Sequence, residues 1–190
     1  SGVVGLISSI ESKASRSGLR LLGAMIARAR RATSSDVTVL PFDQAARRRL
    51  DADSVSVMGF SAGGHVAARL ATGFDAPVYP PRDAIDRLSA RPARAVLVYP
   101  VIDMGAHAHS GSRGRLLGEQ ADAALAAQYS MQQHVRADMP PTLLIHANDD
   151  RVVSVHNSEV MAQALAKAGV EHELHLFAHG GHGFGMRMPP

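Results

Sequence analysis

The stretch Ser54-Val-Ser-Val-Met-Gly-Phe-Ser-Ala-Gly-Gly64 decides the fold. Residues 54–58 form a short run typical of a strand, and residues 65–71 have the small, helix-compatible composition of a packed helix. Between them stands Gly59-Phe-Ser-Ala-Gly63, a G-x-S-x-G pattern whose glycines allow the close backbone contacts of a sharp strand-to-helix turn. Such a turn would lift the hydroxyl of Ser61 above the end of the strand.

The pattern is weak evidence without its context. Composition alone would produce it in roughly one chain in fifteen of this length. Its position between a predicted strand and a predicted helix is what favours a nucleophile elbow, in which the helix N-terminus also faces developing negative charge. The simpler alternative is a glycine-rich turn with an inert serine.

Further strands follow the motif along the chain. Short apolar runs predict strands over residues 95–101, 142–146 and 173–177, and the first two are apolar at successive positions, as in strands buried on both faces. Apolar residues at helical spacing predict a helix over 155–168, with Gly169 as its C-cap. Strands alternating with helices indicate an α/β fold with a mostly parallel sheet flanked by helices.

A serine hydroxyl needs a base, and the base needs a third group to orient it. In the order expected after such a turn, the acid comes next and the histidine last. Asp150 follows the predicted strand 142–146, where functional side chains of an open α/β sheet gather, and Asp149 is its competitor. His182 follows the last predicted strand in a glycine-rich loop. The catalytic candidates are therefore Ser61, Asp150 and His182.

The rest of the chain is less informative. We interpret residues 1–190 as a single domain. Residues 105–139 are polar, with one helical stretch near 122–129, and are expected to form a cap-like excursion over the sheet edge. Within the atypical segment 1–50, residues 19–31 look helical and residues 37–40 could form a strand. No apolar run is long enough for a membrane span or a secretory signal, so we expect a soluble protein and leave the compartment open.

A basic pI of about 9.8 suggests nucleic-acid binding, but other features oppose it. The first fifty residues hold nine Lys or Arg against three acids. Only Phe42 supplies an aromatic ring there, so no stacking platform accompanies the charge. A solvated basic face is the better interpretation, and we expect no nucleic-acid partner.

Metal and thiol chemistry are also disfavoured. The chain has no cysteine, which removes disulfides and thiolate catalysis. Four histidines are close enough in sequence to suggest metal ligands: His172, His175, His179 and His182. Two of them lie three residues apart on a predicted strand and would face opposite sides, and no H-E-x-x-H helix is present. We expect no metal and no cofactor, and we interpret the remaining histidines as surface or structural residues.

The motifs together resemble the α/β-hydrolase esterases related to bacterial acetyl esterases and acetylxylan esterases. The likeness runs from about residue 55 to residue 186. It rests on Met-Gly-Phe-Ser-Ala-Gly-Gly-His (58–65), Val-Tyr-Pro-Val-Ile (98–102), Gly-Ser-Arg-Gly-Arg-Leu-Leu-Gly (111–118), Pro-Pro-Thr-Leu-Leu-Ile-His (140–146), Asp149-Asp150 and Gly-Gly-His-Gly-Phe-Gly (180–185).

The resemblance implies an α/β-hydrolase fold and a Ser61–His182–Asp150 triad. Asp150 is preferred over Asp149 because the family's acid stands two residues before a Val-Val or Val-Pro pair, here Val152-Val153. The backbone N–H of Ala62 would form part of the oxyanion hole. Residues 51–187 would be the family-like catalytic core. The departure lies upstream, because no His-Gly-Gly-Gly loop precedes the elbow and residues 1–50 are too few for the family's early strands.

The resemblance implies a carboxylic-ester hydrolase acting on small acyl groups, acetyl first, on a small molecule or a carbohydrate such as acetylated xylan. A serine peptidase or a dienelactone-type hydrolase on the same fold is the alternative, because one triad serves both ester and amide cleavage. An inactive, truncated hydrolase remnant is the alternative from another class, because the upstream loop is missing. The sequence does not indicate an oligomeric state.

Overall fold

The computed structural model describes residues 56–77, 79–81 and 89–185. A four-stranded sheet forms its centre, with the order β1-β2-β3-β4 and every neighbouring pair parallel. The strands are β1 (Ser56–Phe60), β2 (Arg94–Val98), β3 (Thr142–Ala147) and β4 (His172–Phe177). Because all strands are parallel, their carboxyl ends meet at one edge of the sheet, where side chains from distant segments can converge.

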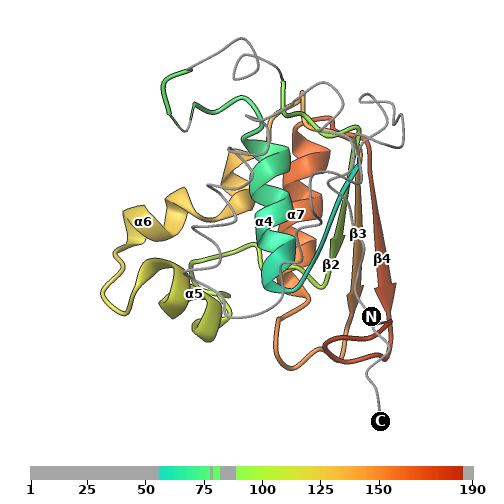
Figure 1. Ribbon diagram of the computed structural model, residues 1–190. Coiled ribbons are helices and arrows are strands. Elements are labelled where there is room, and N and C mark those ends of the chain that lie inside the picture. Colours follow the sequence, from blue (N-terminus) through green and yellow to red (C-terminus); the bar gives the residue numbers. More distant parts are fainter. Residues whose placement is uncertain (1–55, 78, 82–88, 186–190) are drawn as a thin grey trace, which may run out of the picture.

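The described helices lie on one side of this sheet (Figure 1). They are α4 (Ala62–Thr72), α5 (Ser110–Leu117), α6 (Ala123–Gln128), the short 3₁₀ helix η3 (Met131–His134) and α7 (His156–Lys167). α4 and α7 pack directly on the strands. The strands follow one another in space as they do in sequence, so right-handed crossovers place the connecting helices on the same face.

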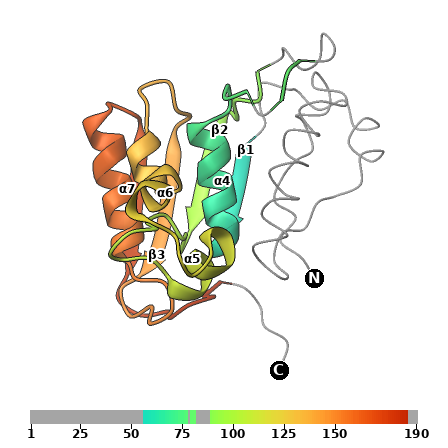
Figure 2. The same cartoon turned by 90° about the vertical axis from the view of Figure 1, so that its left-hand side faces the viewer.

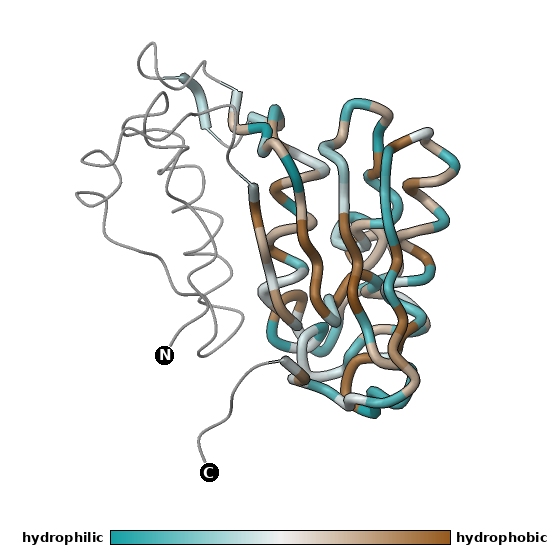
Figure 3. Tube along the Cα trace, turned by 90° about the vertical axis from the view of Figure 1, so that its right-hand side faces the viewer, coloured by the Kyte–Doolittle hydropathy of each residue, from teal (hydrophilic) through white to brown (hydrophobic). Residues whose placement is uncertain are grey.

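The core lies between the sheet and these two helices. Leu97 of β2 and Leu144 of β3 are fully buried, as are Ala68 of α4 and Met161 and Leu165 of α7. Viewed from the other side of the sheet, the strands appear largely as hydrophobic segments (Figure 3). The continuous apolar runs of the sequence are therefore explained by a parallel sheet whose central strands are buried.

Within the described residues, the predicted strands and helices are confirmed, with shifts of up to three residues at their ends. α4 begins at Ala62 instead of residue 65, and β2 ends at Val98 instead of residue 101. Tyr99 has a φ of 35°, outside the strand region, and Pro100 has no N–H to donate to a neighbour. At the end of α7, Gly169 adopts a φ of 71°, and the N–H of Val170 donates to the carbonyl of Leu165. This is the glycine-dependent helix end that the sequence predicted.

Residues 105–139 differ from their prediction. They contain α5 and η3 as well as the expected helix α6. α5 and α6 lie outside α4 and α7, on the side away from the strands (Figures 1 and 2), while Met131 and Met139 are buried in the core. Arg113 holds α5 in place, because its guanidinium donates to the carbonyls of Met104 and Ala121. α5 contains two glycines, which have low helix propensity, so the sequence did not predict this helix.

The predictions for residues 19–31 and 37–40, and for the completion of the sheet by residues 1–50, lie outside the described residues. Among the described residues, no helix combines the length and apolar character needed to cross a bilayer.

Leu144 allows a test of this core. Leu144→Ala is expected to lower the free energy of unfolding by about 2–5 kcal/mol, because the truncated side chain leaves a cavity between sheet and helices. Leu176→Ala is the matched control, since Leu176 is 40% exposed and its loss should cost under about 1 kcal/mol. Urea denaturation of both variants measures the difference. Equal losses would contradict the packing described for β3.

Candidate active site

Ser61 occupies the turn between β1 and α4 in a strained conformation. β1 ends at Phe60 and α4 begins at Ala62, and the φ of Ser61 is 52°. Its N–H donates to the carbonyl of Val98, and its own carbonyl accepts from the N–H of Val101. Positive φ is unfavourable for a serine, so these contacts with the neighbouring chain hold the turn in place.

The glycines of the motif are required by close packing. A Cβ on Gly59 would overlap the carbonyl of Gly63 and lie 2.8 Å from the Cβ of Ala67. A Cβ on Gly64 would lie 2.6 Å from the Cβ of Pro100. α4 therefore packs so close to β1, and to Pro100 just after β2, that neither glycine could carry a side chain. This confirms the elbow geometry predicted from G-x-S-x-G.

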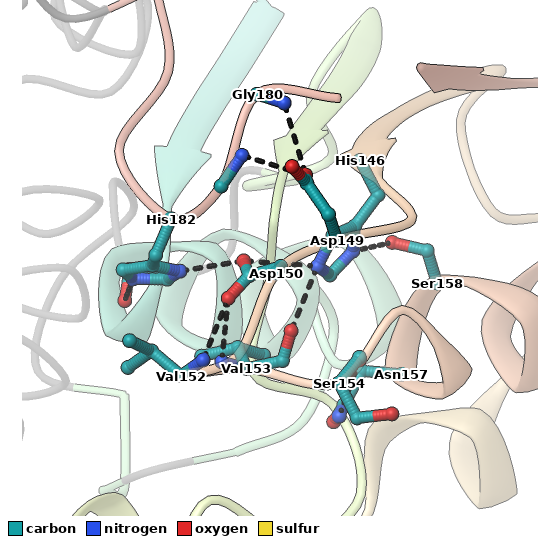
Figure 4. A network of polar contacts seen from close by, with 12 residues as sticks. His146, Asp149, Asp150, Val152, Val153, Ser154, Asn157, Ser158, Gly180 and His182 are labelled. Atoms are coloured by element: carbon teal, nitrogen blue, oxygen red, sulfur yellow. Dashed lines mark hydrogen bonds and ion pairs between the residues drawn. The ribbon is translucent and has the colours of Figure 1, made fainter. Parts of the chain in front are cut away.

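The structure brings together the three residues that the sequence singled out, and Figure 4 shows two of them, His182 and Asp150. The Nε2 atom of His182 lies 2.8 Å from the hydroxyl oxygen of Ser61. Its Nδ1 atom lies 2.7 Å from Oδ2 of Asp150. The serine follows β1, the aspartate follows β3 and the histidine follows β4, so the shared carboxyl edge of the parallel sheet makes the meeting possible.

The two adjacent aspartates have different contacts. Asp150 is buried, and its Oδ1 accepts the N–H groups of Val152 and Val153, each at 2.9 Å. Asp149 points to the loop that carries His182, where its Oδ1 accepts the N–H groups of Gly180 at 2.9 Å and Gly181 at 2.8 Å. Asp149 thus anchors the loop, while Asp150 contacts the imidazole. The contact with the loop backbone was not predicted from the sequence.

Both carboxyl groups have lowered pKa values. Burial raises the pKa of Asp150, but hydrogen bonds from His182 and from the N–H groups of Val153 and Val152 more than offset it. The N–H of Gly181 makes the largest contribution to lowering the pKa of Asp149. Asp150 is therefore an acceptor at neutral pH, and the Nδ1 atom of His182 must carry the proton between them. The Nε2 atom of a neutral His182 is then free to accept the proton of Ser61.

The sequence predicted that the N–H of Ala62 is an oxyanion donor, and Ala62 directly follows Ser61. It is the first residue of α4, and the N–H of a first helical residue has no acceptor within its own helix. The positive end of the helix dipole adds to the attraction for negative charge beside Ser61. The upstream segment in which the resemblance would place a second donor lies outside the described residues.

Tyr99 packs against the histidine, and sequence reasoning missed it. Its ring centroid lies 4.9 Å from that of His182, and the rings of Phe60 and Phe184 lie 5.8 Å and 5.3 Å from it. Burial raises the pKa of Tyr99 to about 12, so the ring stays neutral beside Asp150. Apolar contact on this side limits the positions open to the imidazole. The only signal for it was the Tyr-Pro pair at the end of the predicted strand.

The other histidines were interpreted as surface or structural residues, and the buried ones are satisfied. His65 in α4 bonds the carbonyl of Tyr129 at 2.8 Å, and burial lowers its pKa to about 4. His172 bonds the carbonyl of Val170, and His175 pairs with Glu173. Within the described residues, no three His, Asp or Glu side chains are placed to hold a metal ion.

A family model, described as BD-FAE, matches residues 38–165, which include the elbow and Asp150. The chain belongs to the BD-FAE family.

Two relatives of this BD-FAE chain are named for xylan, one as an esterase and the other as a xylanase. It is 35% identical over 148 residues to an acetylxylan esterase of Xylanibacter ruminicola, a match that covers 75% of this chain and 28% of the relative. It is 33% identical over 139 residues to endo-1,4-beta-xylanase B of Butyrivibrio fibrisolvens, covering 73% of this chain and 22% of that protein. The chain therefore spans about a quarter of the length of these two relatives.

A solved structure confirms the fold. An acetyl ester-xyloside bifunctional hydrolase from Caldicellulosiruptor lactoaceticus superposes with a TM-score of 0.71 at 40% identity, covering 87% of the BD-FAE chain and 57% of the other chain. A carboxylesterase of Lactobacillus plantarum superposes with a TM-score of 0.60 at 26% identity, covering 89% of this chain and 67% of the other. The predicted α/β-hydrolase class is confirmed.

Gly59 allows the elbow to be tested without altering a polar group. Gly59→Ala is expected to destabilise the fold by more than about 2 kcal/mol, because the new methyl group meets backbone that cannot move without shifting α4. Gly111→Ala in α5 is the control, since the nearest atom to its Cβ would be Cε1 of the His109 side chain at 3.2 Å and not backbone. Thermal unfolding of both variants measures the effect. A Gly59→Ala protein as stable as wild type would contradict the close approach.

The lowered pKa of Asp150 predicts how stability responds to acid. A carboxyl group whose folded pKa is depressed stabilises the fold above its unfolded value of 3.8 and loses that contribution as pH falls through the folded pKa. The free energy of unfolding of the wild type should therefore decline below about pH 4 more steeply than that of Asp150→Asn. Urea denaturation at a series of acidic pH values gives both slopes. Parallel slopes would show that Asp150 has no perturbed pKa.

Proposed function

We propose that this chain is the catalytic part of a serine carboxylic-ester hydrolase that removes small acyl groups, acetyl first, from carbohydrate such as xylan. One observation carries the proposal: the hydrogen-bonded series from Ser61 through His182 to Asp150 at the carboxyl edge of the sheet. The series has the donors and acceptors that nucleophilic acyl transfer requires. The coarser assignment, ester hydrolysis, is also supported by relatives named as esterases.

Acylation begins at the hydroxyl of Ser61. Its oxygen attacks the ester carbonyl while its proton passes to Nε2 of His182, and the carbonyl oxygen becomes an oxyanion. Asp150 stabilises the resulting imidazolium through its bond to Nδ1. When the tetrahedral intermediate collapses, the bond to the alcohol oxygen breaks and Nε2 returns the proton to that oxygen. The alcohol leaves, and the acyl group stays on Ser61.

Deacylation repeats the same proton transfers with water. His182 takes a proton from a water molecule as it attacks the acyl carbonyl, and the second intermediate collapses to release the acid and regenerate Ser61. The N–H of Ala62 would stabilise the oxyanion in both steps. Removal of one donor of this kind costs on the order of a hundred- to a thousandfold in rate, so the part of the chain outside the described residues matters for the rate.

The names of the relatives support the substrate, which is the finer part of the proposal. An acetylxylan esterase, a xylanase and a hydrolase named for acetyl esters and xylosides all resemble this chain. We assign residues 105–139 to the alcohol side of the pocket. In support, burial lowers the pKa of His109 at the start of α5, and an electrostatic interaction with His182 lowers it further. Residues 51–187 form the catalytic core in this proposal.

The test compares the whole chain with three variants on 4-nitrophenyl acetate and on acetylated xylan. Ser61→Ala should lower kcat/KM at least about a thousandfold, because the nucleophile is lost. Asp150→Asn should lower it on the order of 10⁴-fold, because an amide holds the imidazole in the wrong tautomer. Asp149→Asn is the matched control and should lose much less, since it weakens only contacts to the loop backbone. Equal losses for the two aspartates would contradict the assignment.

The same experiment separates the alternatives. Ser61-dependent cleavage of peptides in preference to acetyl esters would replace the esterase with a peptidase, and preference for a lactone would indicate a dienelactone-type hydrolase. A protein that unfolds cooperatively yet hydrolyses none of these substrates would be the inactive remnant. Acetate release from xylan that survives in Ser61→Ala would reject the proposed nucleophile.

A further inference from the structure

His146 lies behind the proposed triad and takes no part in the mechanism above. It is near the end of β3, fully buried, and both of its ring nitrogens have partners (Figure 4). Nδ1 lies 2.8 Å from the hydroxyl of Ser158 in α7, and Nε2 lies 3.0 Å from the carbonyl of Val153. Nε2 is also 3.3 Å from Oδ2 of Asp150, the oxygen that bonds His182.

The direction of each hydrogen bond around His146 follows from its partners. The carbonyl of Val153 can only accept, so Nε2 must carry the proton. In the neutral ring Nδ1 is then an acceptor, and the hydroxyl of Ser158, itself fully buried, donates to it. The carbonyl of Val153 therefore sets the tautomer, and the hydroxyl of Ser158 adapts to it. Two imidazole nitrogens then lie close to the same carboxylate oxygen, Nδ1 of His182 at 2.7 Å and Nε2 of His146 at 3.3 Å.

Burial keeps His146 neutral. It lowers the pKa of His146 more than the carbonyl of Val153 and the carboxylate of Asp150 raise it. The titratable groups near the shared carboxylate are His182, Asp149 with His179, Tyr99 and His109. α7 contributes the neutral hydroxyl of Ser158. A neutral donor fits this place, because a second positive charge beside Asp150 would oppose protonation of His182 during the reaction.

We propose that His146, with its tautomer set by the carbonyl of Val153, is a positioning residue that fixes the Asp150 carboxylate and tunes the basicity of His182. The inference rests on the proposed function. Oδ1 of Asp150 is held by two backbone N–H groups, whereas the imidazole of His182 is the other side chain that contacts Oδ2. The N–H of His146 approaches Oδ2 from the buried side and completes the set of donors.

Removing the N–H of His146 changes the charge distribution on Asp150. A variant that only loses packing around His146 would not have this effect. An Asp150 carboxylate with one donor fewer carries more negative charge on Oδ2, so it stabilises the imidazolium of His182 more strongly. The pKa of His182 then rises, and the acidic limb of kcat/KM moves to higher pH. At the same time a less firmly held carboxylate orients His182 less well, which lowers kcat and leaves KM for a small ester nearly unchanged.

The experiment uses the whole chain with 4-nitrophenyl acetate, and rates are normalised to the acyl-enzyme burst. His146→Leu is expected to lower kcat about tenfold or more and to shift the acidic limb upward by about half a pH unit. Ser158→Ala should shift it in the same direction by less, because the ring keeps its tautomer but Nδ1 loses its hydrogen-bond donor, which makes the N–H at Nε2 a weaker donor. His146→Gln should recover part of kcat, since its amide N–H can reach Asp150.

His65→Gln is the matched control. His65 is also a buried histidine that bonds a backbone carbonyl, but its partner is Tyr129 and not the triad. This variant should unfold at a lower temperature with an unmoved acidic limb, which is the signature of a purely structural histidine. His146 variants that behave in the same way, losing stability and no more, would overturn the inference.

A second measurement does not depend on catalysis. In a chain with ¹⁵N-labelled histidine, the titration of His182 is followed by NMR in wild type, Ser158→Ala and His146→Gln. A raised His182 pKa in Ser158→Ala supports the inference even if His146→Leu does not fold, and an unchanged value overturns it. If the wild type hydrolyses no ester, the proposed function fails, while this titration still reports whether His146 and Ser158 act on the Asp150–His182 pair.

Discussion

The buried carboxylate of Asp150 is the interaction on which the site depends. An ionised group away from water is tolerated only when donors surround it. Here the donors come from different parts of the fold: the N–H groups of Val152 and Val153 just after β3, and the imidazole of His182 beyond β4. Compensation of one charge therefore ties two neighbouring strand ends together, and the loop that carries His182 cannot move away without leaving that charge less satisfied.

Backbone strain is concentrated at the same edge. Among the described residues, Ser61 and Tyr99 are the non-glycine residues with positive φ, and they end the adjacent strands β1 and β2. Each is held by its N–H, which donates to the carbonyl of the next strand, from Ser61 to Val98 and from Tyr99 to Ile145. The regular ladder of the sheet thus supports two unfavourable residues, one of which presents the hydroxyl while the other supports the imidazole.

The adjacent aspartates show how the loop and the triad are stabilised separately. Asp149 binds the loop backbone at Gly180 and Gly181, and Asp150 binds the ring of His182. The first contact places the loop and the second orients the side chain that it carries. Neighbouring residues point their side chains in different directions. Asp149 and Asp150 therefore contact different groups although both are aspartates.

The sequence by itself determined the four strands, the helices α4, α6 and α7, the elbow at Ser61 and the candidates Asp150 and His182. These features are local: a turn needs glycines at fixed positions, and buried parallel strands need continuous apolar runs. The choice between Asp149 and Asp150 came from a resemblance, because spacing alone does not say which way each side chain points. Only the tertiary structure placed α5 outside α4, packed Tyr99 on His182 and brought His146 to Asp150. Those contacts join residues far apart in the chain, or side chains whose direction depends on packing, and no local pattern encodes them.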